Sequence, residues 1–362
     1  MSDSVSTGSA GSTNATDSAS AASPTSPANA SAQRIPLSLI DFCTLYSGES
    51  TADTMARSVE FARSAEKLGF SRIWYAEHHN MPHIASSVPA LIMAHVGAHT
   101  DSIRLGAGGV MLPNHSPYSI AEQYGTLAEM YPGRIDLGLG RAPGTDMHTL
   151  GRALRRDPRA AENFPDDVRQ LQGFLGAPED SPVPGVIAIP GRNTNVPLFI
   201  LGSSMFGASL AAKYGLPYAF ASHFAPQHLE NATAYYRENF QPSEYLSEPY
   251  VIAAVNVIAD ETTEGAQQQF DQVARSRVRA FAARGRKITD AQLEDLVHSP
   301  QGQQIISMLH YTAVGTEDEV RDYLQDFAAT AHADELMISL QGTTFDDTAA
   351  GMQHLANAWQ LG

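Results

Sequence analysis

The sequence predicts an α/β fold, a closed (β/α)₈ barrel. From residue 34 onward, short apolar runs alternate with longer segments of helical period. The runs are apolar on both faces, which is typical of parallel strands that helices cover. Eight such units occur along the chain, and this number favours a closed barrel. A doubly wound open sheet remains the alternative, because miscounting one or two strands would remove the distinction.

The elements follow one another in a regular order. Ser50 to Asp53 offers a cap for the first helix, and Gly69 ends that helix. An Ala-rich helix up to about residue 99 follows the second strand, and the last helix covers roughly 347–360. The predicted strands are 37–42, 72–78, 103–112, 135–141, 197–203, 218–224, 250–259 and 335–341.

Two connections are longer than usual in a compact domain. They are 142–196, after the fourth strand, and 260–334, after the seventh. Long insertions of this kind are more often functional than idle. We expect 142–196 to act as a lid over the barrel mouth.

Composition divides the chain and limits its partners. Residues 1–33 are a low-complexity segment with too little apolar surface to fold, so we expect a disordered tail before one barrel domain at 34–362. The net charge of −16 argues against binding to nucleic acid or to anionic membrane surfaces. A single cysteine, Cys43, excludes an intrachain disulfide and favours a cytoplasmic location. No apolar run is long enough to span a bilayer.

The active site of such a barrel lies at the carboxyl ends of its strands. The fourth strand ends in GLGRAPG, where Arg141 can bind a phosphate through its planar fork and the glycines leave the backbone open. The glycine spacing does not fit a dinucleotide fingerprint. The alternative is a tight turn with a surface arginine.

The next strand ends in Gly202, Ser203 and Ser204, at the start of a helix. Free amides and two hydroxyls there make an anion site, although N-capping is the commoner use of serine. Arg141 from the adjacent strand would bring two phosphate-binding features into one corner.

The second strand ends in two adjacent histidines, His78 and His79, which would point to opposite faces of a strand. This arrangement argues against a two-histidine metal site, and we expect no metal. A hydrogen-bonding role is the alternative to catalysis for the inward histidine.

The run GlyAlaGlyGly at 106–109 is costly inside the third strand, so we expect a bulge, an unusual peptide geometry or a flat ligand there. Cys43 is interpreted as a small core residue, and the arginines at 152, 155 and 156 as a solvated helix face.

Four blocks in order resemble the bacterial luciferase-like flavin-dependent monooxygenases, and in particular the luciferase-like class oxidoreductases. The resemblance covers the chain from about residue 36 to its end. The blocks are AEHHNMPHIASS, LGAGGVMLPNHSPYSIAEQ, YPGRIDLGLGRAPGTD and PLFILGSSMFGASLAAKYGLPYAFASHF.

The resemblance implies a barrel that binds reduced FMN and uses O₂ to oxygenate a small organic substrate. His78 matches the active-site histidine near the isoalloxazine ring. Gly108 and Gly109 match a dipeptide behind the ring whose bond is often cis. Arg141, with the loop that contains Gly202, Ser203, Ser204, Phe206 and Gly207, matches the phosphate-binding residues.

The chain also departs from the luciferase catalytic subunit. Gly140 stands where that subunit has a reactive cysteine, and Gly202 stands where it has an acidic residue. Light emission is therefore not expected. A hydride-transfer enzyme that uses the deazaflavin F420, or a flavin-binding subunit without turnover, remains as an alternative.

Two protein partners are expected. No nicotinamide fingerprint is visible, so a separate NAD(P)H-dependent flavin reductase is expected to supply the electrons. The resemblance implies a homodimer that pairs through the helices at 86–99 and 118–130.

Overall fold

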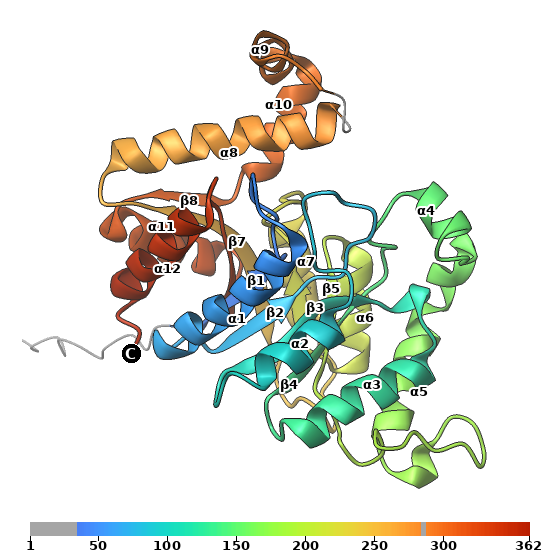
Figure 1. The fold of residues 1–362 in the computed structure, drawn as a ribbon. Helices are drawn as coiled ribbons and strands as arrows, with labels where there is room; N and C mark the ends of the chain where they lie inside the picture. The colour runs from blue at the N-terminus through green and yellow to red at the C-terminus, as the bar shows by residue number, and fades with distance from the viewer. Residues whose placement is uncertain (1–34, 284–286) are drawn as a thin grey trace, which may run out of the picture. The chain divides into compact units, whose positions relative to one another are not determined.

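The structure of the protein, a computed structural model, describes residues 35–283 and 287–362 (Figure 1). The tail predicted for residues 1–33 lies outside the described residues. Ile35–Gly362 forms one compact unit. None of the described helices is long and apolar enough to cross a membrane.

Eight parallel strands close the predicted barrel. Each strand from β1 to β6 pairs with the strand that follows it in sequence. β9 pairs with both β7 and β1 and so closes the barrel. All eight predicted strands are therefore confirmed, and the open-sheet alternative is wrong. The barrel strands are β1 (Leu37–Asp41), β2 (Arg72–Tyr75), β3 (Arg104–Met111), β4 (Ile135–Gly140), β5 (Leu198–Gly202), β6 (Tyr218–Phe220), β7 (Val251–Ala259) and β9 (Glu335–Leu340).

A ninth strand, β8 (Thr312–Gly315), was not predicted. It pairs with the last four residues of β7, Asn256 to Ala259, and with none of the other described strands. β7 is nine residues long, and β9 uses its earlier part, Ile252 to Val257. The end of β7 therefore continues beyond the barrel, and a short strand of the second insertion extends the sheet there.

Helices surround the strands. Ser50 and Asp53 form the predicted capping box of α1, and Gly69 follows the end of that helix with φ +88. The described helices are α1 (Thr51–Lys67), α2 (Pro89–Gly97), α3 (Pro117–Met130), α4 (Met147–Arg152), α5 (Phe164–Leu175), α6 (Met205–Tyr214), α7 (Leu229–Glu238), α8 (Thr263–Ala283), α9 (Asp290–His298), α10 (Pro300–Ile306), α11 (Glu317–Thr330) and α12 (Phe345–Trp359).

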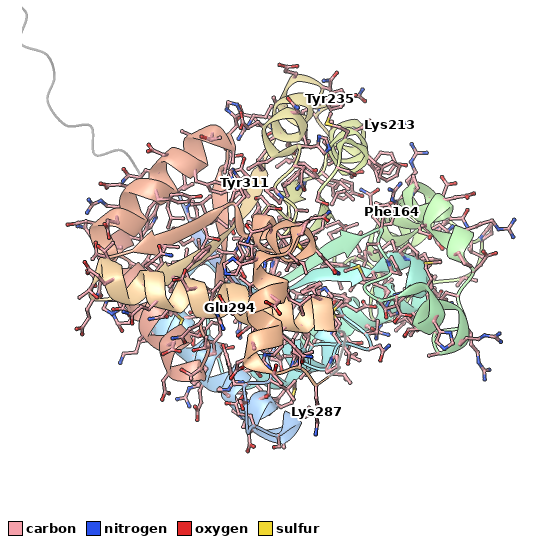
Figure 2. The ribbon with its side chains drawn as sticks, turned by 90° about the horizontal axis from the view of Figure 1, so that it is seen from above. Phe164, Lys213, Tyr235, Lys287, Glu294 and Tyr311 are labelled. Carbon is pink, nitrogen blue, oxygen red and sulfur yellow. The ribbon has the colours of Figure 1, made fainter. Side chains whose placement is uncertain are left out.

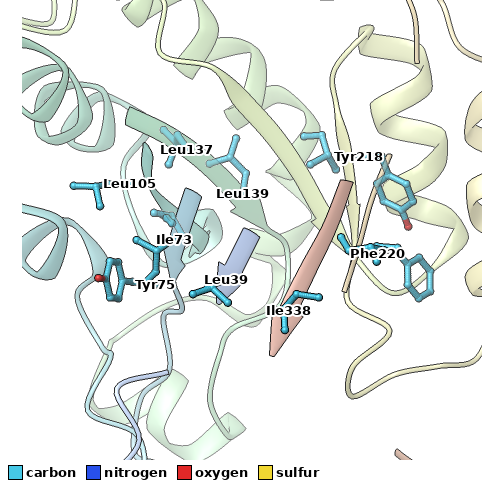
Figure 3. Close-up of a cluster of buried hydrophobic side chains, with 14 of the residues drawn as sticks. Leu39, Ile73, Tyr75, Leu105, Leu137, Leu139, Tyr218, Phe220 and Ile338 are labelled. Atoms are coloured by element: carbon cyan, nitrogen blue, oxygen red, sulfur yellow. The ribbon is translucent and has the colours of Figure 1, made fainter. Parts of the chain in front are cut away.

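Alternate residues of the strands build two apolar layers, as the two-residue period of a strand requires. Leu39, Ile73 and Ile338 belong to the larger cluster, which lies between strands and helices (Figure 3). Their neighbours Ile40, Trp74 and Met337 form a separate cluster inside the barrel. The strands are buried on both faces, in agreement with the apolar runs in the sequence.

Ion pairs fill the amino-terminal end of the barrel interior. Arg72, the first residue of β2, contacts Asp136 (Nη1 to Oδ2, 2.7 Å) and Glu335 (Nε to Oε1, 2.8 Å). Trp74 Nε1 also donates to Asp136 Oδ2 at 3.3 Å. These ion pairs compensate the buried charges at the amino-terminal end of the barrel.

Both long insertions have structure of their own. Residues 142–196 contain α4 and α5, and 260–334 contain β8 and the helices from α8 to α11. In Figure 1, α8 runs across the upper end of the barrel. Figure 2 looks down on this end and shows the layer that carries Glu294 in front of the strands.

Candidate active site

Arg141 and the loop after β5 lie together, as the sequence predicted. Arg141 directly follows β4, and its Cζ lies 3.9 Å from the ring centroid of Phe206 in the first turn of α6. The Arg141 side chain is exposed and forms no ion pair with any carboxylate in the described part of the chain. A guanidinium without a counter-ion beside a helix start is suited to bind an anion.

The start of α6 offers free hydrogen-bonding groups. Ser204 is its N-cap residue, but its side chain makes no capping hydrogen bond, so the simple capping alternative is wrong. A Cβ at Gly202 would meet only Gly207 Cα, at 3.8 Å, whereas a Cβ at Gly207 would lie 3.1 Å from Tyr218. Gly207 is therefore packed against β6, and Gly202 leaves open space at the strand end.

The glycines around Arg141 have a different role from the one expected. A Cβ at Gly140 would lie 2.9 Å from Met111 Sδ, and one at Gly144 would lie 2.7 Å from Glu77 O. Gly144 also has φ +65. These glycines admit neighbouring protein segments, so the tight-turn interpretation is correct for the backbone.

Gly108 and Gly109 lie in the barrel wall, and the peptide bond between them is cis. The pairing of β3 with β4 shifts register between Ala107 and Val110. The predicted bulge and unusual peptide geometry are both confirmed. A Cβ at Gly109 would lie 2.7 Å from Gly138 O, so the wall itself leaves no room for a side chain there.

β2 ends at Tyr75 and not at 78, so His78 and His79 lie in the following loop. The two rings still diverge. His79 Nε2 lies 3.0 Å from Glu77 Oε1, whereas the His78 ring lies 5.9 Å from the ring of Phe42. His78 Nδ1 is buried and has no hydrogen-bond partner in the described structure. Burial lowers the pKa of His78, so the imidazole is neutral at pH 7.

Glu77 organises this rim, and the sequence did not single it out. Its buried carboxylate accepts from Met111 N at 3.0 Å and contacts the Nε2 atoms of His115 (2.8 Å) and His79 (3.0 Å). Burial alone would raise the pKa of Glu77, but the hydrogen bonds outweigh it and lower the pKa to about 2. Over the described residues, no group of three or more His, Cys, Asp or Glu is placed to hold a metal.

Sequence reasoning placed His223 near a strand end without giving it a role, and it missed Arg277. β6 ends at Phe220, earlier than predicted, and His223 lies in the loop after it, 5.9 Å from the Phe42 ring. Burial, with the charges of Arg277 and His78, lowers the pKa of His223 to about 3. A histidine near a strand end was a readable signal. An arginine on a helix 54 residues later was not, because only tertiary packing brings it to the site.

The first insertion borders the Arg141 side of the rim. A small cavity of about 70 Å³ lies between them, and its lining includes Arg141, Leu150 and Arg156. The arginines at 152, 155 and 156 are exposed, as predicted for a solvated face. The residues that line this cavity are Pro113, Asn114, Arg141, Pro143, Met147, Leu150, Arg156, Asp157, Pro158 and Ala161.

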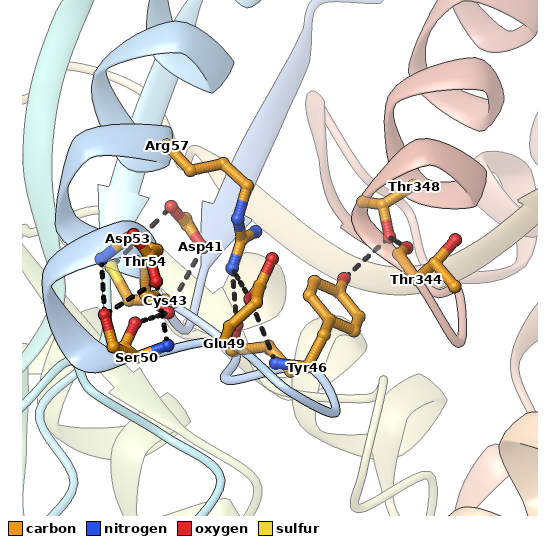
Figure 4. Close-up of polar contacts among 11 residues, drawn as sticks. Asp41, Cys43, Tyr46, Glu49, Ser50, Asp53, Thr54, Arg57, Thr344 and Thr348 are labelled. Atoms are coloured by element: carbon orange, nitrogen blue, oxygen red, sulfur yellow. Dashed lines mark hydrogen bonds and ion pairs between the residues drawn. The ribbon is translucent and has the colours of Figure 1, made fainter.

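Cys43 follows β1 in an internal polar network (Figure 4). Its Sγ lies 3.7 Å from Asp41 Oδ2, and Arg57 Nη2 donates to Thr44 O and to Glu49 Oε2, both at 2.8 Å. Burial and the charge of Asp41 raise the pKa of the thiol well above its usual range. Cys43 is therefore a protonated core residue, as predicted.

Comparison with known proteins places these features in context. Residues 38–335 match the model of the family described as luciferase-like monooxygenase. A luciferase-like monooxygenase of Escherichia coli (strain K12) is 42% identical over 317 residues, which are 87% of this chain and 93% of that protein. An N-acetyl-S-alkylcysteine monooxygenase of Bacillus subtilis (strain 168) is 30% identical over 84% of this chain and 92% of that protein.

Among solved structures, apo-MsnO8 has a similar fold with a TM-score of 0.76. It is 30% identical to this chain, and the match covers 91% of this chain and 99% of that one. The similarity therefore includes both long insertions as well as the barrel.

Proposed function

Because the chain belongs to the luciferase-like monooxygenase family, we propose that it binds reduced FMN and oxygenates a small organic substrate with O₂. The observation that carries the proposal is the unpaired Arg141 beside the uncapped start of α6. Arg141 would hold the phosphate through its guanidinium, and Ser203 and Ser204 through amides and hydroxyls. When bound, reduced FMN supplies the electrons for the activation of O₂.

The chain's own residues would order and shield the reaction space. The Phe42 ring lies 5.9 Å from the rings of both His78 and His223, where an apolar side chain would exclude water from the imidazoles. His78 is neutral at pH 7, so its Nδ1 can accept a proton or, in the other tautomer, donate a hydrogen bond. We assign His78 the proton transfer next to the cofactor ring, and Gly108 and Gly109 the wall behind that ring. The two insertions would close the mouth from opposite sides.

The partners follow from the same proposal. A separate NAD(P)H-dependent reductase in the cytoplasm would supply reduced FMN. A homodimer would pair through α2 and α3, where Leu91, Val88 and Met130 are exposed apolar side chains.

The phosphate site is tested by titrating the protein with FMN and following flavin fluorescence. We expect Arg141→Ala to weaken binding by about 2–4 kcal/mol, the scale for leaving a charged ligand group unpaired. Arg152→Ala is the matched control, because it removes an exposed arginine of the adjacent insertion, 142–196. Equal FMN affinity in wild type and Arg141→Ala would remove the phosphate assignment.

The deazaflavin F420 is the alternative cofactor, because proteins that use either cofactor share this fold. An FMN-bound Baeyer-Villiger monooxygenase component from Pseudomonas putida (16% identity, TM-score 0.64) and an F420-dependent secondary alcohol dehydrogenase (15% identity, TM-score 0.65) both share the fold. Titration with F420 distinguishes FMN-dependent oxygenation from F420-dependent hydride transfer. Tight binding of F420 without binding of FMN would support hydride transfer and contradict the proposed oxygenation.

Turnover is measured as O₂ consumption with FMN, NADH and a flavin reductase. The Bacillus subtilis relative is named for N-acetyl-S-alkylcysteines, so thioethers of that class belong in the first substrate panel. Substrate-dependent O₂ uptake together with an oxygenated product supports the proposal. FMN binding without turnover on any member of the panel would favour the flavin-binding subunit instead.

A further inference from the structure

Three buried nitrogen atoms without partners gather at the barrel mouth. They are Nδ1 of His78, Nδ1 of His223 and Nη1 of Arg277, each with no hydrogen-bond partner within the described ranges. Both imidazoles pack against Phe42, each with its ring centroid 5.9 Å away. Arg277 is close enough for its charge to act on His223. Buried polar groups in native proteins are nearly always satisfied, so a cluster of unsatisfied ones indicates a missing ligand.

The position of Arg277 on α8 is unusual for a charged residue. Phe270, Val273 and Ala274 form the apolar stripe of α8 that packs with Ile258 of β7. Arg277 follows Val273 by four residues, Ala274 by three and Phe270 by seven. At these helical spacings it lies on the same stripe. The helix therefore directs a guanidinium toward the barrel, where an apolar side chain would suit the packing better.

The neighbouring arginines of α8 show the contrast. Arg275 pairs with Glu294, and Arg279 pairs with Asp290 (Nη2 to Oδ1, 2.9 Å), both on α9. Arg277 has no carboxylate partner in the part of the chain that the structure describes. Burial alone lowers its pKa, to about 10, so the group stays cationic at pH 7. A largely buried cation without a counter-ion is costly for a fold, and a ligand that brings the counter-ion explains its presence.

A hydrogen bond from β7 holds the loop after β6, which carries His223, in place. Asn256, a buried residue of β7, donates from Nδ2 to His223 O at 2.7 Å. This bond fixes the backbone that presents the His223 ring. The adjacent Phe224 has an exposed fraction of 44%, and its ring lies 5.0 Å from that of His223. An exposed apolar side chain therefore lies beside His223.

We propose that Arg277 binds a carboxylate group of the substrate and that the protein acts on small organic acids with an apolar body. The planar guanidinium matches the two oxygens of a carboxylate, and its single charge matches one anion. His223 would donate a hydrogen bond to the same group from Nδ1. The aromatic rings of Phe42 and Phe224 would contact the apolar part and leave the carboxylate as the fixed end. That the bound acid is a substrate rests on the proposed function. Carboxylate binding itself does not, because it can be measured on the protein without cofactor.

The direct test compares sodium hexanoate with hexanamide, which has the same chain and no charge. Isothermal titration calorimetry on the cofactor-free protein should show millimolar or tighter binding of hexanoate and at least about 30-fold weaker binding of hexanamide. Arg277→Met should weaken hexanoate binding by the same factor. Arg279→Met, which removes an arginine of the same helix whose partner is on α9, should leave it unchanged. Equal binding of the two ligands, or hexanoate binding that survives Arg277→Met, would overturn the proposal.

Two further readouts separate this role from others. Arg277→Met should keep or raise the melting temperature, because it removes an unpaired buried charge, whereas an arginine required for folding would give a lower one. FMN affinity should change less than threefold or so in Arg277→Met, far below the loss expected for Arg141→Ala. If Arg277→Met abolished FMN binding as well, Arg277 would serve the cofactor and the proposal would be wrong. If wild type bound hexanoate but no flavin, the proposed function would fail and the carboxylate site would stand.

Discussion

Substitution of Glu77 by glutamine tests how the rim of the barrel is held. The pKa of this carboxyl is lowered from 4.5 to about 2 by hydrogen bonds from His115, His79 and Met111 N. The pKa therefore falls from 4.5 to about 2 on folding. At about 1.36 kcal/mol for each pKa unit, the folded state favours the ionised carboxyl by roughly 3 kcal/mol. Glutamine keeps one acceptor for Met111 N. We therefore expect Glu77→Gln to lower the free energy of unfolding at pH 7 by about 2–3 kcal/mol.

The sign of the pH dependence follows from linkage. The pKa of Glu77 is lower in the folded state, so the carboxylate stabilises the fold above pH 4.5 and loses this effect as the pH falls toward 2. The wild-type advantage over Glu77→Gln should therefore shrink by about 1.4 kcal/mol between pH 7 and pH 3.5. Urea unfolding followed by circular dichroism at both pH values measures this directly.

The control for this experiment is Glu294→Gln. Glu294 also contacts a histidine, His298, at 3.0 Å, but on exposed helices. Its substitution should leave the unfolding free energy close to that of wild type, because exposed pairs contribute little. The reasoning fails if Glu77→Gln is as stable as wild type at pH 7, or if the gap between them stays constant down to pH 3.5.

Three other substitutions test separate parts of the structure. His223→Gln should reduce the loss of unfolding free energy at acid pH, because the folded pKa of His223, about 3, lies below its unfolded value. Wild type should lose about 2 kcal/mol of unfolding free energy between pH 7 and 5 that the variant keeps. Urea unfolding that shows the same loss in both proteins would contradict this. Gly109→Ala should cost about 2 kcal/mol or more or prevent folding, because its Cβ would lie 2.7 Å from Gly138 O, whereas Gly151→Ala, with nothing within 4 Å, should be tolerated; equal melting temperatures would refute the packing argument. Leu91→Asp, at a side chain with an exposed fraction of 70%, should convert a dimer to a monomer in sedimentation, and an unchanged mass would remove α2 from the interface.

Much of the candidate site could be predicted from the sequence, because the active site of a barrel lies at the carboxyl ends of its strands. Arg141 and Ser204 are far apart in sequence, but each follows a strand, and β4 and β5 are adjacent in the barrel. Neighbouring parallel strands bring their carboxyl ends together, so both residues were expected in one corner. The ends of β2 and β6 were placed too late, because only one alanine continues each apolar run before polar residues of the loop begin.

By itself, the sequence determined the eight barrel strands, the capping of α1 and the corner formed by Arg141 and the α6 start, because each depends on local pattern or on strand order. Only the tertiary structure decided the roles of Glu77 and Arg277. Glu77 accepts from His115, 38 residues away, and α8, which carries Arg277, runs across the upper end of the barrel (Figure 1). Such contacts depend on how helices and loops pack, and side-chain packing over long separations leaves no periodic trace in the sequence.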